Sequence, residues 1–382
     1  MIEVRAEVGP PGPYRLPRPS ADGLLRARDG VLFRFVRSDG HDVLLRAARL
    51  RDGRVVLGAR ATPRPEEQAR TAAAGAERAR AAADGALGRW RFALGVDVDL
   101  APFVQAHKDD PLIGPSIRAR PWMRPARRLS VFEALICAVC EQLIAYEDAV
   151  RIERRLIARH GVVRAPDVAT HPRLRDAPDA VELADGTVPA HLEACGLSPK
   201  RATALHRAAR EIARGRIDTS DGCDPDRVLL RLGRLPEIGT WTLSLVASQA
   251  LGRDDRPPSG DLNLRKALGR ILTGDPRARV PEHEVDAWLS RYAPWGALAA
   301  VHVMATRGEA LPGRGAGTVP VVPAPVARRH ATQAGLPVGG RRSVDDPSRV
   351  GVARPRTVLV EEPGTPGPGT PPVRVGAPTA AA

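Results

Sequence analysis

The spacing of apolar residues changes along this chain from that of strands to that of helices. Residues 31–37 (VLFRFVR) alternate apolar and polar side chains, as a half-buried strand does. Two similar segments, 42–50 and 54–59, follow the turn sequences Ser-Asp-Gly and Arg-Asp-Gly. We therefore expect a small antiparallel meander over 31–59, preceded by an extended, Pro-rich segment over 1–20.

Helical patterns dominate the rest of the chain up to about residue 311. The segment 65–95 is rich in Ala, Glu and Arg, which favour helices, and from about residue 101 the pattern is almost wholly helical. The predicted fold is an α+β N-terminal module over 1–100, with a small antiparallel sheet and helices, followed by an all-α domain over 101–311.

Local start signals support these helices. Ser130 and Glu133 form a predicted capping box in front of a helical run that Gly161 ends. Further helix starts are expected at Ser198-Pro199, Asp224-Pro225, Pro281 and Trp295.

The segment 312–382 is dense in Pro, Gly and Ala. Such a composition buries too little apolar surface to offset the entropy of ordering, so we expect a disordered tail. The tail is mildly basic, and two hypotheses remain open: an inert tail, or an electrostatic tether to DNA.

Charge and composition restrict the partners. The net charge of +14 favours polyanions, nucleic acid first, although three lysines among many arginines also fit a GC-rich coding bias. No apolar run is long enough to span a membrane, and the N-terminus has no secretory apolar core. We expect a cytoplasmic, nucleoid-associated protein whose four cysteines are buried thiols, without metal-ligand spacing.

A tight turn, Leu235-Pro236-Glu237-Ile238-Gly239, lies between two predicted helices. Proline fixes φ at its entry, and glycine permits a close or left-handed approach at its exit. The next helix, from Thr240, presents free N–H groups and the positive end of its dipole, which together suit a phosphate. The turn thus fits either a plain helix connection or a DNA-backbone contact.

Asp261 follows a Pro/Gly-rich loop, about twenty residues after this turn. Its position before LNLRKALGRIL makes it a predicted N-cap of that helix. The helix dipole and N–H groups hold such a carboxylate ionised, and a fixed anion can also face a developing positive charge. The structural and the chemical interpretation are compatible.

Together these motifs resemble the helix-hairpin-helix DNA glycosylases, within them the bacterial 3-methyladenine DNA glycosylase II group. The resemblance covers about residues 13–308. It depends on the hairpin LPEIGTW, on GDLNLRKA around Asp261, on the Phe132–Ile144 helix and turn, on Gly196–Ala202, and on Ala-Pro-Trp at 293–295 followed by His302. A lone histidine on an apolar helix is more often a core group, and we interpret His302 in that way.

The resemblance implies an enzyme that flips a damaged nucleotide out of double-stranded DNA and hydrolyses its base–sugar bond in base-excision repair. Asp261 takes the place of the family's essential carboxylate. Strand-cutting members carry a lysine nucleophile where this chain has Trp241, which implies a monofunctional hydrolase without lyase activity. The main alternatives are a related glycosylase for deaminated or oxidised bases and a non-catalytic DNA-binding protein.

The resemblance also places a base pocket, a wedge and a hairpin contact. Trp241, Leu245, Leu262 and Met304 would line the base pocket, although only Trp241 is aromatic, and it could equally be a core residue. Ile117 would be the wedge that fills the gap left by a flipped base, or else an ordinary packed loop residue. The DNA-binding hairpin would comprise Leu235, Pro236, Ile238, Gly239 and Thr240.

The resemblance implies an enzyme that requires no cofactor. No cysteine follows Cys223, so the iron–sulfur cluster of one family branch is not expected. Backbone carbonyls of the hairpin could bind a monovalent cation, and no other metal site is predicted. We expect a monomer.

Overall fold

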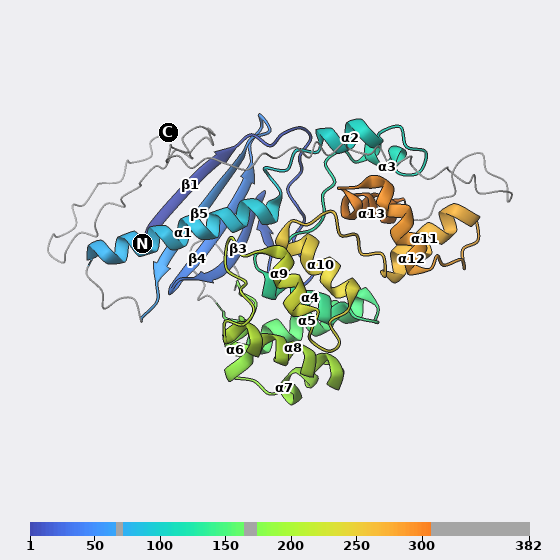
Figure 1. Ribbon diagram of the computed structural model, residues 1–382. Coiled ribbons are helices and arrows are strands. Elements are labelled where there is room, and N and C mark those ends of the chain that lie inside the picture. The colour runs from blue at the N-terminus through green and yellow to red at the C-terminus, as the bar shows by residue number, and fades with distance from the viewer. Residues whose placement is uncertain (66–71, 164–173, 307–382) are drawn as a thin grey trace, which may run out of the picture.

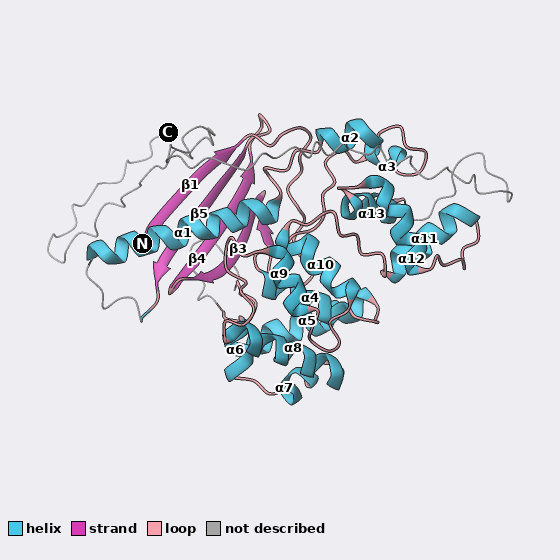
Figure 2. Ribbon diagram, in the orientation of Figure 1, coloured by secondary structure: helices cyan, strands magenta, loops and turns pink. Residues whose placement is uncertain are grey.

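The computed structural model describes residues 1–65, 72–163 and 174–306 of the chain (Figure 1). The expected tail over 312–382 and the first residues of the helix predicted over 65–95 lie outside the described residues. Within them, an N-terminal sheet is followed by helices, as the sequence predicted (Figure 2).

Five antiparallel strands form the sheet in the order β1-β5-β4-β3-β2. Their bounds are β1 Ile2–Val8, β2 Arg26–Arg28, β3 Val31–Ser38, β4 His41–Arg49 and β5 Val55–Pro63. Strands β3 to β5 are the predicted meander. Strand β1 was expected only as an extended segment. It pairs with β5 from Ile2↔Ala61 to Val8↔Val55, a long-range pairing that no local turn signal announces.

Helix α1 (Ala72–Leu94) lies across one face of the sheet (Figure 1). Apolar side chains from both elements form one buried cluster. Two side-chain hydrogen bonds fix its C-terminal end: the Trp90 indole donates to the Arg46 carbonyl (3.2 Å), and the Tyr14 hydroxyl donates to the Leu94 carbonyl (2.9 Å). These contacts hold α1 against the sheet.

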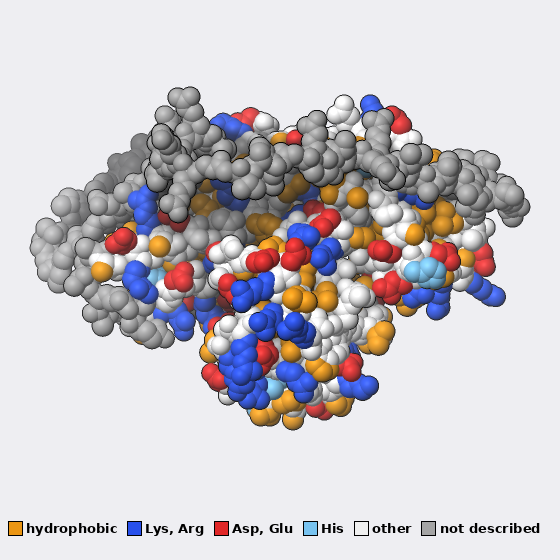
Figure 3. Space-filling view, viewed as in Figure 1, with side chains coloured by type: hydrophobic (Ala, Val, Ile, Leu, Met, Phe, Trp, Pro, Cys, Tyr) orange, Lys and Arg blue, Asp and Glu red, His pale blue; other side chains and the backbone are white. Residues whose placement is uncertain are grey.

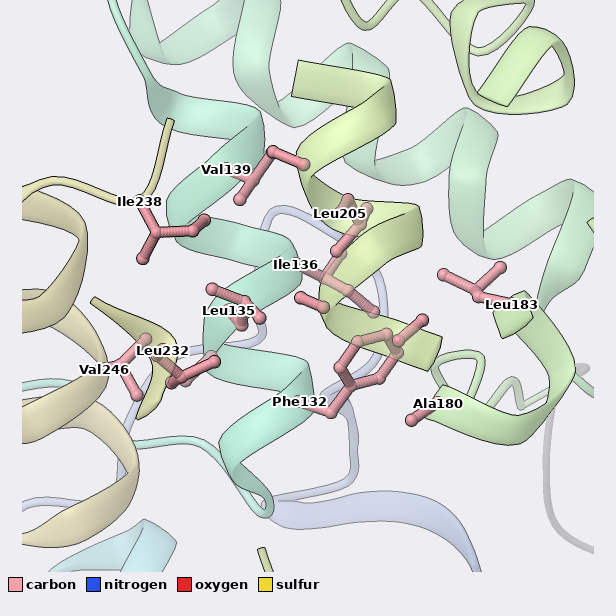
Figure 4. Close-up of a cluster of buried hydrophobic side chains, with 14 of the residues drawn as sticks. Phe132, Leu135, Ile136, Val139, Ala180, Leu183, Leu205, Leu232, Ile238 and Val246 are labelled. Atoms are coloured by element: carbon pink, nitrogen blue, oxygen red, sulfur yellow. The ribbon is translucent and has the colours of Figure 1, made fainter. Parts of the chain in front are cut away.

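The helices after the sheet form two packed groups. One contains α4 (Val131–Glu141), α5 (Tyr146–His160), α6 (Ala180–Asp185), α7 (Pro189–Glu193), α8 (Pro199–Ala213), α9 (Pro225–Leu232) and α10 (Thr240–Leu251), around the core drawn in Figure 4. The other contains α2 (Ala101–His107), α3 (Gly114–Ala119), α11 (Leu262–Thr273), α12 (Glu282–Leu289), the 3₁₀ turn η2 (Ser290–Tyr292) and α13 (Gly296–Ala305). The second group thus joins segments from both ends of the helical region, so α10 and α11 belong to different groups and the loop 252–261 connects them.

The helix starts agree largely with the local signals. Asp224 caps α9 through the N–H groups of Asp226 and Arg227, and Ser130 accepts a hydrogen bond from the N–H of Glu133 (3.1 Å). The capping box at Ser130 is only half formed, because the Glu133 carboxylate pairs with Arg34 (2.8 Å) of β3 instead. Glutamate at this position therefore ties the helical region to the sheet.

The predicted run from Ser130 to Gly161 is divided into α4 and α5. The break falls at 142–145, where Leu143 has a φ of 57°, in the left-handed region. None of the helices within 72–163 and 174–306 is both long and apolar enough to cross a bilayer.

Candidate active site

Asp261 is the N-cap of α11, as predicted, and both of its carboxylate oxygens have partners. Oδ1 accepts a hydrogen bond from the Leu264 N–H (2.9 Å), and Oδ2 accepts one from the indole Nε1 of Trp241 (3.2 Å). The side chain is half-buried.

Trp241 lies in the first turn of α10, directly after the hairpin, and is half-buried. Its indole reaches across to the start of α11, so one side chain connects the two helical groups at Asp261. The sequence predicted one of two roles for Trp241, a core aromatic residue or a wall of the base pocket. The structure adds a third role, because the indole N–H fixes the direction of the Asp261 carboxylate.

The hairpin between α9 and α10 is held from inside. Ile238 is 5% exposed and packs into the core drawn in Figure 4, so its side chain is not available to a ligand. Gly239 is the N-cap of α10 with φ −90°, so of the two predicted alternatives, a close or a left-handed approach, the left-handed one does not occur there. Glu237 takes that conformation instead, with φ 67°. The space beside Gly239 is open, because an added Cβ would meet no atom within 4 Å.

Gln142 ties the turn after α4 to this hairpin. Its Nε2 donates to the Glu237 carbonyl (2.9 Å) and to the Thr242 hydroxyl (3.0 Å). The exposed hairpin residues and the turn at 142–145 therefore form one surface. Basic side chains gather on the face over α8 and α9 beside it (Figure 3), and exposed residues there include Lys200, Arg207, Arg231 and Arg234.

The predicted pocket residues are distributed over three helices, α10, α11 and α13. Leu262 follows Asp261 and is 46% exposed, Leu245 is half-buried one turn after Trp241, and Met304 is 39% exposed near the end of α13. Helices α11 and α13 pack against each other. None of these aliphatic side chains lines the cavity between the N-terminal segment 15–25, the linker 122–129 and helices α4 and α5.

Ile117 is wrong as the wedge. It is fully buried in α3, within the core of α2, α3 and α11–α13, and so cannot enter a duplex. The other interpretation of this residue, a packed core group, is the one that the structure supports.

Leu143 is the exposed apolar residue that sequence reasoning did not assign. Its side chain is fully exposed, with a left-handed backbone, next to the Gln142 link to the hairpin. A fully exposed leucine with positive φ buries no apolar surface and adopts a backbone conformation that is uncommon for leucine. The helical pattern on both sides hid the break that exposes it.

His302 is a core group, as interpreted. It is 2% exposed, its Nδ1 lies 3.0 Å from the Ser116 hydroxyl, and its ring stacks on Phe103. Burial lowers its pKa to about 4, and the charge of Arg120 contributes to this shift. It stays neutral at physiological pH.

A cavity of about 640 Å³ lies between the N-terminal segment 15–25, the linker 122–129 and helices α4 and α5. Its lining includes Trp122, Tyr146, Glu141 and Glu153 as well as several arginines. Burial raises the pKa of the Glu141 carboxyl group in this lining; a hydrogen bond from Cys137 and the charge of Arg128 oppose the rise, and the charge of Asp261 adds to it.

Comparisons with known proteins place this arrangement. No family model matches the chain. The chain is 28% identical over 221 residues to the "Probable bifunctional transcriptional activator/DNA repair enzyme AlkA" of two strains of Mycobacterium tuberculosis. The aligned residues make up 58% of this chain. The chain spans 42% of the length of these curated relatives.

Solved structures share the fold. A 3-methyladenine DNA glycosylase from Archaeoglobus fulgidus superposes with a TM-score of 0.59 at 20% identity, over 78% of this chain and 96% of that one. An 8-oxoguanine glycosylase/lyase from Clostridium acetobutylicum, solved with double-stranded DNA, gives 0.51 at 12% identity, over 73% and 96%. In sequence this chain is similar to proteins named DNA repair enzyme AlkA, and it shares its fold with a 3-methyladenine DNA glycosylase, in agreement with the resemblance that its motifs predicted.

Proposed function

We propose that this protein is a monofunctional DNA glycosylase that flips alkylated purines out of double-stranded DNA and hydrolyses their N-glycosidic bond in base-excision repair. The observation that carries the proposal is the Asp261 carboxylate, fixed by the N–H groups of Leu264 and Trp241 at the start of α11 and just behind the hairpin.

Asp261 would stabilise the positive charge that develops on the sugar as the bond to the base breaks. Water adds its oxygen to C1′ and releases a proton, while the bonding electron pair neutralises the alkylated base. A cationic purine is already a good leaving group, so one carboxylate suffices without a strong general acid.

Trp241 carries the second part of the proposal. An indole cannot form a Schiff base with the sugar, so the abasic site would be released uncut. Its observed task is to direct the carboxylate of Asp261.

The hairpin would hold the DNA backbone. The first N–H groups of α10 are free of intrahelical partners, and the open space beside Gly239 admits a phosphate oxygen. Ile238, anchored in the core, keeps the backbone in this position. A monovalent cation bound by the hairpin carbonyls stays a prediction.

Leu143 replaces Ile117 as the proposed wedge. Its exposed side chain would enter the base stack where the flipped nucleotide leaves. Gln142, bonded to the hairpin, would keep this wedge in register with the phosphate contact.

The aliphatic character of Leu245, Leu262 and Met304 favours two alternative functions. One is a DNA-binding protein of this fold without turnover, and the other is a glycosylase for deaminated or oxidised bases.

A single-turnover assay separates these alternatives from the proposed function. It uses duplexes that carry 3-methyladenine, 7-methylguanine, hypoxanthine or 1,N6-ethenoadenine. We expect release of the methylated purines by the monomeric protein, without strand cleavage and without a borohydride-trapped adduct. Binding without release of any base would contradict the proposal.

A further inference from the structure

The large cavity has an acidic inner wall. Four carboxyl groups, those of Asp22, Glu133, Glu141 and Glu153, line it together with the guanidinium groups of Arg34 and Arg128. Arg128 forms a short ion pair with Asp22 (2.5 Å) and longer ones with Glu133 (3.6 Å) and Glu153 (3.5 Å), and Arg34 pairs with Glu133.

Arg15, Arg124 and Arg127 of the cavity lining have separate partners, and Arg18 is exposed. Arg127 pairs with Asp254, Arg124 donates to the carbonyls of Pro13, Trp122 and Val98, and Arg15 stacks over the ring of Trp122. They belong to the outer wall, made by the segment 15–19 and the linker 122–127. The inner wall therefore holds four carboxyl groups and two arginines, a surplus of two carboxyl groups.

Glu141 and Glu153 carry this surplus. Glu153 is 5% exposed and, within the described residues, has no hydrogen bond besides the long ion pair to Arg128. Glu141 is half-buried and, within the described residues, accepts a hydrogen bond only from the weak S–H donor of Cys137, at 3.4 Å. Carboxyl groups that are shielded from water are normally hydrogen-bonded, so a half-buried and a buried one with such poor partners beside a cavity point to a ligand that completes them.

Glu141 lines the cavity and is the last residue of α4. Gln142, the next residue, donates to the Glu237 carbonyl of the hairpin and to the hydroxyl of Thr242, which follows Trp241, the partner of Asp261. A base leaving the duplex beside Leu143, with its sugar at Asp261, would meet the Glu141 carboxyl at the entrance of this cavity.

We propose that Glu141, with Glu153 behind it, is the specificity-determining carboxyl group of the base site and selects purines that are cationic or present N–H donors toward it. This inference rests on the proposed function. It explains the aliphatic surroundings of Asp261: a charge-assisted contact from Glu141 replaces the attraction of aromatic faces for a cationic base. The arginines of the outer wall would lie toward the flanking phosphates.

The first measurement compares lesions under single-turnover conditions. Wild type, Glu141→Gln and Glu153→Gln are assayed on cationic 7-methylguanine and 3-methyladenine and on neutral hypoxanthine and 1,N6-ethenoadenine. Glu147→Gln, an exposed glutamate in the first turn of α5, is the matched control. Circular dichroism and thermal unfolding verify that each variant is folded.

We expect Glu141→Gln to lower the rate ratio of cationic to neutral lesions by at least about tenfold, Glu153→Gln to lower it less, and Glu147→Gln to leave it unchanged. An unchanged ratio in Glu141→Gln would overturn the inference while leaving the proposed function standing.

A binding measurement decides the matter independently of turnover. Tryptophan fluorescence follows titration with the cation 3,9-dimethyladeninium and with neutral 9-methyladenine. We expect wild type to bind the cation at least about tenfold more tightly than the neutral base, and Glu141→Gln to lose this preference. Equal affinities in wild type, or a preference kept in Glu141→Gln, would overturn the inference, whether or not any base is released.

Discussion

The indole Nε1 of Trp241 donates a hydrogen bond to Oδ2 of Asp261 across 3.2 Å, from the first turn of α10 to the N-cap of α11. The two residues lie in different helical groups, and the loop 252–261 that joins them holds no other donor to this oxygen within the described residues. Trp241 is therefore a positioning residue for the proposed catalytic carboxylate.

Trp241→Phe tests this role because it keeps the ring and removes the donor. A hydrogen bond to a charged group contributes about 1.5–3 kcal/mol, so we expect the single-turnover rate of base release to fall about ten- to hundredfold. DNA affinity should stay near that of wild type. Trp288→Phe, on α12, is the control; an equal loss in both variants would argue against a specific role of the indole N–H.

Leu143→Gly separates stability from function at the proposed wedge. A non-glycine residue in the left-handed region costs about 1–2 kcal/mol, so glycine should leave the free energy of unfolding unchanged or raise it, while base release from duplex DNA slows. Ile117→Ala should instead lower the free energy of unfolding by about 2–5 kcal/mol, because it removes a fully buried side chain. Urea unfolding and single-turnover rates measure both effects. Full activity of Leu143→Gly would remove the wedge assignment.

Gly239→Ala tests the hairpin as a phosphate site. The free protein has room for the methyl group and φ is −90°, so unfolding free energy should change by less than about 0.5 kcal/mol. The methyl group would occupy the space in front of the α10 N–H groups, and we expect the dissociation constant for duplex DNA to rise severalfold. Gly88→Ala, in α1, also has open space and serves as the control for affinity. Unaltered binding by Gly239→Ala would place the backbone contact elsewhere.

Glu153 predicts a pH dependence of stability. Burial raises its pKa from 4.5 to about 7; Arg128 opposes this rise, and the charges of Asp22, Glu141 and Glu133 add to it. The folded state therefore binds this proton more tightly than the unfolded state, so its stabilisation is complete below pH 4.5 and is lost as pH rises toward 7.

Glu153→Gln removes the ionisable group, so the variant does not lose this stabilisation as pH rises. We expect the variant to be more stable than wild type at pH 8 by about 1–3 kcal/mol, with a difference that shrinks as pH falls to 5. Urea unfolding at pH 5, 6, 7 and 8 gives the difference directly. A variant less stable than wild type at pH 8 would mean that the ion pair with Arg128 outweighs the burial of the charge.

Local signals in the sequence were sufficient for the parts of the fold that depend on neighbours along the chain. The meander over 31–59 follows from alternation and turn residues, and the caps at Asp224 and Asp261 follow from side chains that bond N–H groups two or three residues later. Asp261 was therefore located from its own surroundings, before any tertiary contact was known.

Long-range contacts were the parts that the sequence could not specify. Strand β1 finds its partner more than forty residues away, and Ile117 is buried by helices from the far end of the chain. The sequence around Leu143 has the pattern of one continuous helix. Leu143 is exposed because the helix breaks between α4 and α5, where Gln142 donates hydrogen bonds to Glu237 and Thr242. The acidic wall joins Asp22 to α4 and α5 through Arg128, a set that no local spacing reveals.

The most direct test of the account is the single-turnover rate of base release by Asp261→Asn on duplex DNA that carries 3-methyladenine, beside a binding titration on the same duplex. Asparagine keeps one acceptor oxygen, so it can accept one of the two hydrogen bonds that Asp261 accepts, and it carries no charge. We predict a rate lower by at least about 10²–10³ with DNA affinity retained. Release at the wild-type rate would contradict the account.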